Sequence, residues 1–137
     1  MTLDEAIVNL FRSYPPLTSL VGTRIYPDTY PQNATFPLLL YAQTSRLPEY
    51  SHDGACGAAE SRYQLSAVAK SKASARQTAD TMYAALRPWE QAQAQVAPDL
   101  RIGGVFMEDE LSIFAAADVE SESTYHILGD YRFLWGN

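Results

Sequence analysis

The chain has 137 residues, 47% hydrophobic and 19% charged, which is typical of a globular protein and predicts a single domain over residues 1–137. Its 10 Lys and Arg against 16 Asp and Glu give a formal net charge of −6, which argues against nucleic-acid binding because the chain as a whole repels a phosphate backbone. The single cysteine, the acidic start and the short longest apolar run, LLLYA, argue against a disulfide framework, secretion and membrane insertion.

A first helix is predicted near residues 3–13. Leu3, Ile7 and Phe11 recur at helical spacing, and the sequence TLDE has the form of a capping box. The following Tyr-Pro-Pro is expected to end this helix. The next stretch is rich in Pro, Gly, Asn and Thr, which predicts a structured loop containing a short extended piece at Thr23–Tyr26.

Two strands are predicted in the middle of the chain, over Phe36–Arg46 and residues 61–70. Tyr63, Leu65 and Ala67 alternate with polar residues, which indicates a strand with one face in water. The segment between the strands, LPEYSHDGACGAAE, contains glycines. We expect it to be the long loop of a hairpin.

A second long helix is predicted over residues 73–87. Ala75, Ala79, Met82 and Leu86 form one helical stripe, Ser74 and Gln77 offer a capping box, and Pro88 follows. Residues 88–104 are polar and rich in Gln and Ala. For them we expect one further helical turn and then a connection that the sequence does not place.

The last third of the chain predicts two closing segments of strand. The first is Val105–Ala116, folded around a turn at Glu108–Glu110, and the second is Tyr125–Trp135, bulged at Gly129. The order of helix, strands, helix and strands predicts an α+β fold. In that fold a mostly antiparallel sheet carries two helices packed on one face.

His52 and Cys56 raise the question of a catalytic thiol or a metal site. A cysteine nucleophile needs a base or cation beside it, and a zinc ion needs about four ligands. The other histidine, His126, lies in a predicted strand where it points away from the core. Gly54 and Gly57 disfavour the helix that would align His52 with Cys56. We therefore predict no catalytic residue, no metal and no cofactor in this segment.

Three further patterns have a chemical and a structural interpretation. The carboxylates at Glu108–Glu110 could bind a divalent cation, but a solvated turn explains them better. VGTRIY contains a glycine before a strand but lacks a phosphate-binding glycine pattern. An aromatic set near the end of the chain could stack on bases, but Arg132 alone accompanies it, so core packing is the better interpretation; the set is Tyr125, Tyr131, Phe133 and Trp135.

Several pieces of the sequence follow one another in a distinctive order and spacing. A Gly-x-Arg-Ile-Tyr-Pro step leads through a Pro-Gln turn to a strand opened by a proline, and a Ser-x-Asp-Gly loop precedes the middle strand. The residues are Gly22, Arg24, Ile25, Tyr26, Pro27, Pro31, Gln32, Pro37, Ser51, Asp53 and Gly54. Together these pieces resemble the phage tail-completion family, which includes siphophage-type tail terminators. The stretch 88–104 departs from the family in being longer and richer in Gln and Ala.

The resemblance implies a structural virion protein and not an enzyme. Such a protein caps the tail tube as a homo-oligomeric ring, expected to be hexameric, and joins it to the head. Its implied partners are the tail tube protein and the head–tail connector, without specific nucleic-acid or membrane binding. The implied location is the tail neck of the virion, after assembly in the host cytoplasm.

The glycine-rich loop is the expected contact between subunits, because a loop of this kind can become ordered on assembly. The residues expected at this interface are Leu47, Pro48, Tyr50, Ser51, His52, Asp53 and Gly54. The alternative hypothesis is a small-ligand-binding or regulatory α+β domain that dimerises through a sheet edge. A large apolar pocket with convergent polar groups would favour this alternative.

Overall fold

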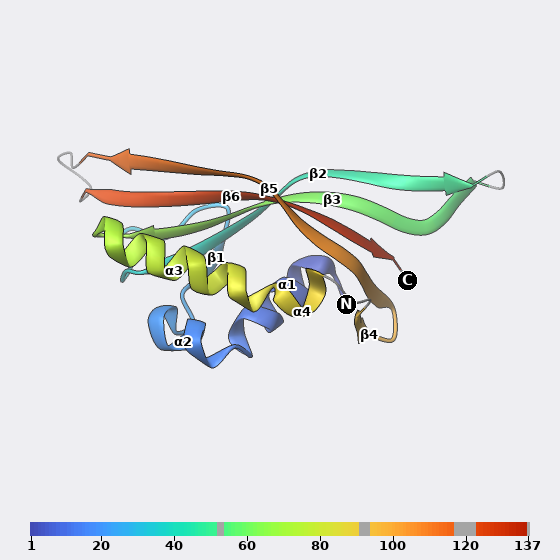
Figure 1. The fold of residues 1–137 in the computed structure, drawn as a ribbon, viewed down its shortest axis with the longest axis horizontal. Coiled ribbons are helices and arrows are strands. Elements are labelled where there is room, and N and C mark those ends of the chain that lie inside the picture. Colours follow the sequence, from blue (N-terminus) through green and yellow to red (C-terminus); the bar gives the residue numbers. More distant parts are fainter. Residues whose placement is uncertain (52–53, 91–93, 117–122, 137) are drawn as a thin grey trace.

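The computed structural model describes residues 1–51, 54–90, 94–116 and 123–136. Four helices and six strands follow one another along the described chain (Figure 1). In order they are α1 (Leu3–Arg12), α2 (Pro15–Val21), β1 (Ile25–Pro27), β2 (Leu38–Ser51), β3 (Gly54–Ala69), α3 (Lys72–Ala85), α4 (Arg87–Glu90), β4 (Ala94–Ala97), β5 (Leu100–Ala115) and β6 (Thr124–Gly136).

The strands form one sheet in the order β1-β2-β3-β6-β5-β4. β1 is parallel to β2, and the other neighbouring pairs are antiparallel. The helices lie together on one side of this sheet, and α3 packs beneath β3 and β6 (Figure 1). We call the opposite side the helix-free face.

The core lies between the helices and the sheet face that they cover. Ile7 and Phe11 of α1, Met82 of α3 and Tyr63 and Phe133 of the sheet are almost completely buried there. Because strand side chains alternate between faces, this burial places Ser61, Tyr63 and Leu65 on the helix side of β3. Glu60, Arg62 and Gln64 consequently lie on the helix-free face.

The predicted first helix and its capping box are both confirmed. The Thr2 hydroxyl accepts the backbone N–H of Glu5 at 3.2 Å, and the Glu5 carboxylate accepts the backbone N–H of Thr2 at 2.9 Å. The two bonds satisfy backbone donors that the first helical turn would otherwise leave open.

The helix α2 was not predicted. Pro15 and Pro16 end α1 as expected, but they also occupy the first positions of α2. A proline is well suited to that place, because its fixed φ is helical and its missing N–H has no helical partner there. The same two prolines therefore separate two helices.

The second predicted helix is confirmed as α3, but its cap is wrong. Ser71, rather than Ser74, is the N-cap residue, and its hydroxyl accepts the N–H of Ser74 at 3.1 Å. The further turn expected after Pro88 is α4, which includes Pro88 itself. The connection that the sequence did not place contains β4, paired with the start of β5.

The predicted long loop at residues 47–60 is wrong in its described part. β2 continues to Ser51 and β3 begins at Gly54, and Tyr50 is in register with Ala55. Register shifts occur between Gln43 and Ser45 and between Pro48 and Tyr50. The segment is thus a two-stranded ribbon that twists at its irregularities.

The turn predicted at Glu108–Glu110 is also wrong. These residues lie within the continuous strand β5, where a register shift occurs between Met107 and Asp109. The bulge expected at Gly129 is not found either, since Gly129 pairs in unbroken register with Leu65 and Glu110. The irregularity lies on the neighbouring strand.

Candidate assembly interface

The end of the β2–β3 hairpin forms an arm beyond the helices (Figure 1). We define this arm as the described residues 45–51 and 54–60. Leu47 is 65% exposed and stands in register with Glu60, which places it on the helix-free face. On the helix side, the Arg46 guanidinium lies 5.0 Å from the centre of the Trp135 ring, a cation–π contact that holds the base of the arm to β6.

The residues predicted from the sequence for a subunit contact are distributed over this arm. Leu47, Pro48, Tyr50 and Ser51 belong to β2, and Gly54 belongs to β3. His52 and Asp53 lie outside the described residues, as does the side chain of Cys56. The prediction of an interface at these positions therefore stays a prediction.

The Gly-x-Arg-Ile-Tyr-Pro step has a structural role. Gly22 ends α2 with a φ of 58°, a conformation that favours glycine. Arg24 Nε donates to the carbonyl of Pro37 at 3.0 Å, and its Nη2 donates to the carbonyl of Leu20 at 3.0 Å. These bonds fix Ile25, the first residue of β1, beside Leu39 of β2.

The remaining motif residues lie around this junction. Tyr26 and Pro27 complete β1, and Pro37 directly precedes β2. Pro31 and Gln32 are exposed in the connection, where the Pro31 carbonyl accepts the N–H of Ala34 at 3.2 Å. The motif therefore positions the β1–β2 edge of the sheet.

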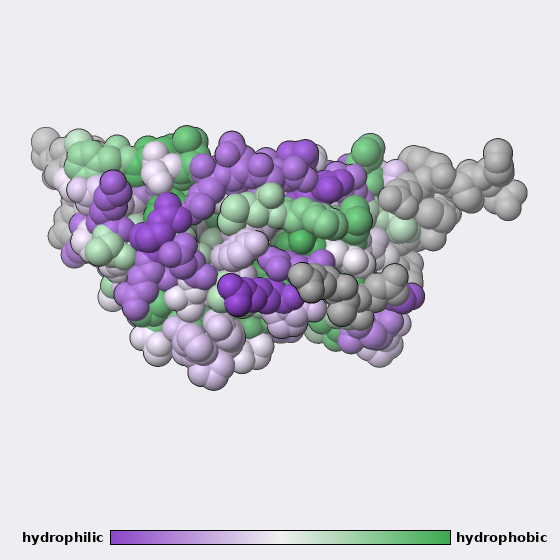
Figure 2. All heavy atoms as spheres, in the orientation of Figure 1, coloured by the Kyte–Doolittle hydropathy of each residue, from purple (hydrophilic) through white to green (hydrophobic). Residues whose placement is uncertain are grey.

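The most unusual surface was missed by sequence reasoning and lies on β5. Of the seven large hydrophobic side chains exposed in the described part of the chain, five belong to this strand. They are Phe106, Met107, Leu111, Ile113 and Phe114. Figure 2 shows hydrophobic surface at the end of the molecule where Figure 1 places the C-terminal half of β5. Single exposed hydrophobic residues are common, whereas a cluster of them marks an interaction surface.

The signal for this surface was present in the sequence as LSIFAAA. The expectation for it was a strand that follows a turn at the acidic residues Glu108–Glu110. A hairpin would have turned the apolar residues back onto the sheet. A continuous strand instead carries them out to its margin.

Two acidic residues of β5 form ion pairs, one with helix α3 and one with the neighbouring strand β6. Glu110 lies 2.6 Å from Arg76 of α3, and Glu108 lies 2.7 Å from Arg132 Nε. The second contact is off the line of the N–H bond, so it is an ion pair rather than a hydrogen bond. Within the described residues, no three His, Cys, Asp or Glu side chains group as a metal site.

The aromatic set near the end of the chain is divided between core and margin. Tyr131 and Phe133 are buried in the core, which confirms the packing interpretation for these two. Trp135 donates its Nε1–H to the Ser61 hydroxyl at 2.9 Å. Tyr125 contacts the exposed ring of Phe114 with the ring centres 4.8 Å apart. His126 lies on the helix-free face in register with Val68, and burial lowers its pKa.

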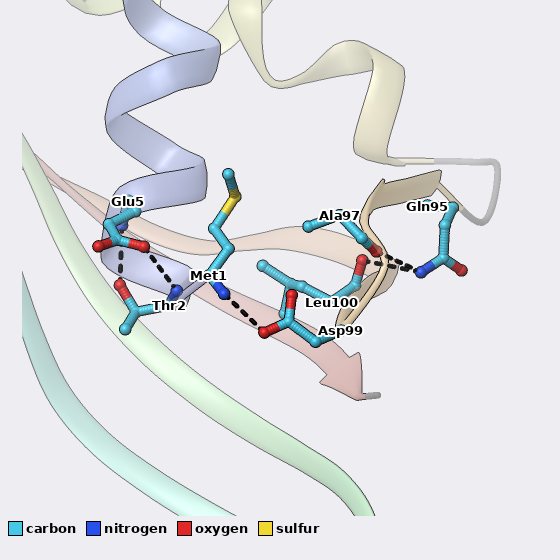
Figure 3. A network of polar contacts seen from close by, with 7 residues as sticks. All are labelled: Met1, Thr2, Glu5, Gln95, Ala97, Asp99 and Leu100. Carbon is cyan, nitrogen blue, oxygen red and sulfur yellow. Dashed lines mark hydrogen bonds and ion pairs between the residues drawn. The ribbon is translucent and has the colours of Figure 1, made fainter.

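A cleft of about 350 Å³ lies between the start of α1 and the base of the arm. Its polar side chains are already partnered across it, since Tyr63 donates to Asp4 and Gln43 donates to Ser61 at 3.4 Å. Beside it, the Met1 ammonium donates to Asp99 at 2.7 Å, which joins the chain start to the β4–β5 turn (Figure 3). This cleft is not the large apolar pocket that a small-ligand site would favour.

Within the described residues, no helix combines the length and the apolar character needed to cross a membrane.

Comparison with known proteins identifies the family. None of the curated protein sequences matches the chain significantly. One matching solved structure is a chain of "Virion of native gene transfer agent (GTA) particle", with a TM-score of 0.74 and 18% identity over 98% of this chain and 95% of that chain. This similarity shows the fold. The family described as "Tail completion protein gp17" matches residues 5–135. The chain therefore belongs to the gp17 family of tail completion proteins and is a structural protein of a phage-like tail.

Proposed function

We propose that this protein terminates the tail tube of a phage or phage-derived particle. Copies of the chain form a ring, with six-fold symmetry, that caps the tube and joins it to the head connector. The tail tube protein and the connector are its partners, and the ring lies at the tail neck after assembly in the host cytoplasm. Family membership over residues 5–135 supports the role in the tail.

The observation that supports the ring is that one subunit has two different surfaces suited to binding other copies. The arm extends β2 and β3 beyond the helices (Figure 1). The exposed hydrophobic residues belong to β5, which lies toward the other edge of the sheet. When one surface binds a different surface of the next copy, the contact repeats and closes into a ring if the rotation allows. The arm residues from Leu47 to Gly54 are the interface that we propose on one side.

The proposed role is non-enzymatic. The groups that an enzyme or a ligand-binding domain would direct into a cavity are instead bonded to one another, as in the pairs Tyr63–Asp4 and Ser61–Trp135. The exposed apolar surface lies outside the cleft, on the margin of the sheet. This arrangement favours a protein–protein assembly over the alternative of a ligand-binding dimer.

The test is a tube-growth experiment with purified tail tube protein. Wild-type protein added during polymerisation is expected to stop elongation, so that tubes measured by electron microscopy become shorter as its concentration rises. A variant with residues 49–58 replaced by Asn-Gly keeps the pair Leu47–Glu60 and closes the hairpin with a favoured turn. We expect this variant to fold and to lose the effect.

Gln77→Ala, at an exposed position of α3, is the control and should act as the wild type does. Tubes of unchanged length at a saturating concentration of wild-type protein would contradict the proposed function. If the truncated variant were fully active, the arm would be excluded as an interface and the proposed function would stand.

A further inference from the structure

We propose that the free edge of β5 in one subunit pairs with the free edge of β2 in the next, so that the sheet continues from copy to copy. The proposal rests on the ring proposed above and adds a strand pairing at the base of the arm to the interface proposed there. The occupant of the exposed β5 edge is a second copy of this chain, bound through backbone hydrogen bonds as well as side chains.

Among the described residues, the β5 edge is open over most of its length. β4 pairs with β5 at Leu100–Ile102 only. From Val105 to Ala115, the strand is paired on its β6 side, and no described strand covers its other edge. The final part, residues 111–115, contains no charge and no proline, and its pairing with β6 is regular.

An edge of this kind is exceptional. Proteins usually protect a long apolar edge with charges, prolines or bulges, because unpaired N–H and C=O groups bind other strands. Leu111 is 56% exposed and Phe114 is 55% exposed. Hydrophobic side chains are thus presented on both faces of an edge that also offers backbone groups.

The β2 edge is open in a matching way. β1 occupies Leu39–Tyr41, and beyond this point β2 is paired on its β3 side alone among the described residues. Pro48 limits pairing farther along the arm, because it has no N–H to donate. The segment that remains, Ala42–Leu47, is six residues long, against five for residues 111–115, and it includes the register shift between Gln43 and Ser45.

The strand directions fit the pairing. β2 is antiparallel to β3, β3 to β6 and β6 to β5. After three reversals, β2 and β5 run antiparallel at the two sides of one sheet. A next copy that continues the sheet therefore presents β2 antiparallel to β5, a pairing with direct inter-strand hydrogen bonds.

The side chains also match across this contact. Leu47 pairs with Glu60, and Leu111 pairs through Leu128 with Ser66. Glu60 and Ser66 are an even number of residues apart on β3, so they share a face. Leu47 and Leu111 consequently both lie on the helix-free face, where opposed apolar side chains stabilise paired strands.

The helix side of the β5 edge offers space for a side chain of the added strand. A groove of about 180 Å³ is lined there by α3, by Phe114 and by Tyr125. Contact between two β5 edges, in contrast, would use the same surface twice and produce a two-fold pair. A two-fold pair cannot extend around a ring, so the ring requires β5 to meet another surface.

Cross-linking of single-cysteine subunits tests the pairing. In a Cys56→Ser background, Leu47→Cys is mixed with Asp109→Cys, Leu111→Cys or Ile113→Cys, three positions on one face of β5. Opposed residues of antiparallel strands lie about 4.5–5.5 Å apart between Cα atoms, within reach of a disulfide. The mixtures are incubated with tail tubes, imaged for rings, and then oxidised.

We expect a covalent dimer in at least one of the three mixtures and a cross-linked ladder from the double variant that combines Leu47→Cys with the β5 cysteine that reacts. Gln77→Cys mixed with Leu47→Cys is the matched control and should give none. Circular dichroism verifies folding, which exposed substitutions should preserve.

Rings without a cross-link above the control would overturn the β5–β2 pairing and leave the proposed ring standing. A dimer from Leu111→Cys alone would overturn it in favour of a two-fold contact. Absence of rings from wild-type protein would contradict both the pairing and the proposed function.

Discussion

The hydroxyl of Tyr63, in the middle of β3, donates a hydrogen bond to the carboxylate of Asp4 in the first turn of α1. Tyr63 is only 1% exposed, so its hydroxyl has exchanged water for this partner. Burial first, and the bond to Asp4 second, raise the pKa of Tyr63 above the ordinary value of 10.0. The contact joins the first helix to the sheet beside the base of the arm.

Tyr63→Phe should lower the free energy of unfolding by about 1 kcal/mol, because it removes a hydrogen bond and leaves the ring in place. Chemical denaturation at neutral pH measures the change. Tyr26→Phe, at a half-buried residue of β1, is the control. It should lower the free energy of unfolding by a smaller amount. Equal effects of the two substitutions would show that the Asp4 bond contributes nothing to stability.

Alkaline pH should destabilise the protein through its buried tyrosines. Burial raises the pKa of both Tyr63 and Tyr131, so the folded state holds these protons more tightly than the unfolded state does. Their contribution is complete below the unfolded pKa and is lost as pH rises above about 10. Denaturation midpoints across this range should fall, and less steeply in Tyr63→Phe. If the midpoint fell equally steeply with pH in Tyr63→Phe and in the wild type, Tyr63 would not be a source of the alkaline destabilisation.

Gly129→Ala should destabilise the fold by about 1–3 kcal/mol, a cost typical of overpacking. A Cβ at this position would overlap the Tyr131 ring, which is buried and cannot move aside. Gly103→Ala is the matched control, since a Cβ there meets its nearest atom at 3.5 Å. Thermal unfolding compares the two, and equal melting temperatures would be inconsistent with the close packing of Tyr131 on β6.

His52→Ala and Cys56→Ser should leave folding and tube capping nearly unchanged, with stability differences below about 0.5 kcal/mol. The reason is that the proposed arm acts through surface and backbone contacts and requires neither a thiol nor an imidazole. Elemental analysis should find no stoichiometric zinc in the purified protein. Bound zinc, or a hydrolytic activity lost in either variant, would refute the structural interpretation of the arm.

The isolated protein should not retain duplex DNA at physiological salt, because its formal net charge is −6 and nothing in that balance attracts phosphates. In an assembled ring the same charge would let DNA pass without being held. A titration followed by fluorescence anisotropy measures binding over a series of salt concentrations. Micromolar binding that weakens with salt would show that a local cluster of positive charge outweighs the net negative charge of the chain.

Local signals in the sequence were sufficient for the long helices. The capping box at Thr2 and Glu5 and the apolar stripe of α3 depend on residues close together in the chain, so the sequence predicts both elements. The additional helix α2 was missed because a proline pair has two meanings, a stop for one helix and a start for the next.

The errors at the arm and at the β5 edge have a different cause. Glycines in the arm and acidic residues at Glu108–Glu110 usually mark loops and turns, since both disfavour strands buried on two sides. At the margin of a sheet, however, side chains reach solvent and strands can include such residues. Sequence reasoning could not identify these margins, because strand order depends on contacts between distant segments. The arm was singled out as a loop, which is wrong, its place at an interface stays a prediction, and the β5 edge was missed.

The proposed function requires that this chain forms rings at the end of a tail tube. Negative-stain electron microscopy of the purified protein, alone and after incubation with tail tubes, is the decisive measurement. We expect rings of six subunits seated on one end of each tube, visible in end views and as a cap in side views. Tubes with bare ends at saturating protein, or protein bound along their whole length, would contradict it.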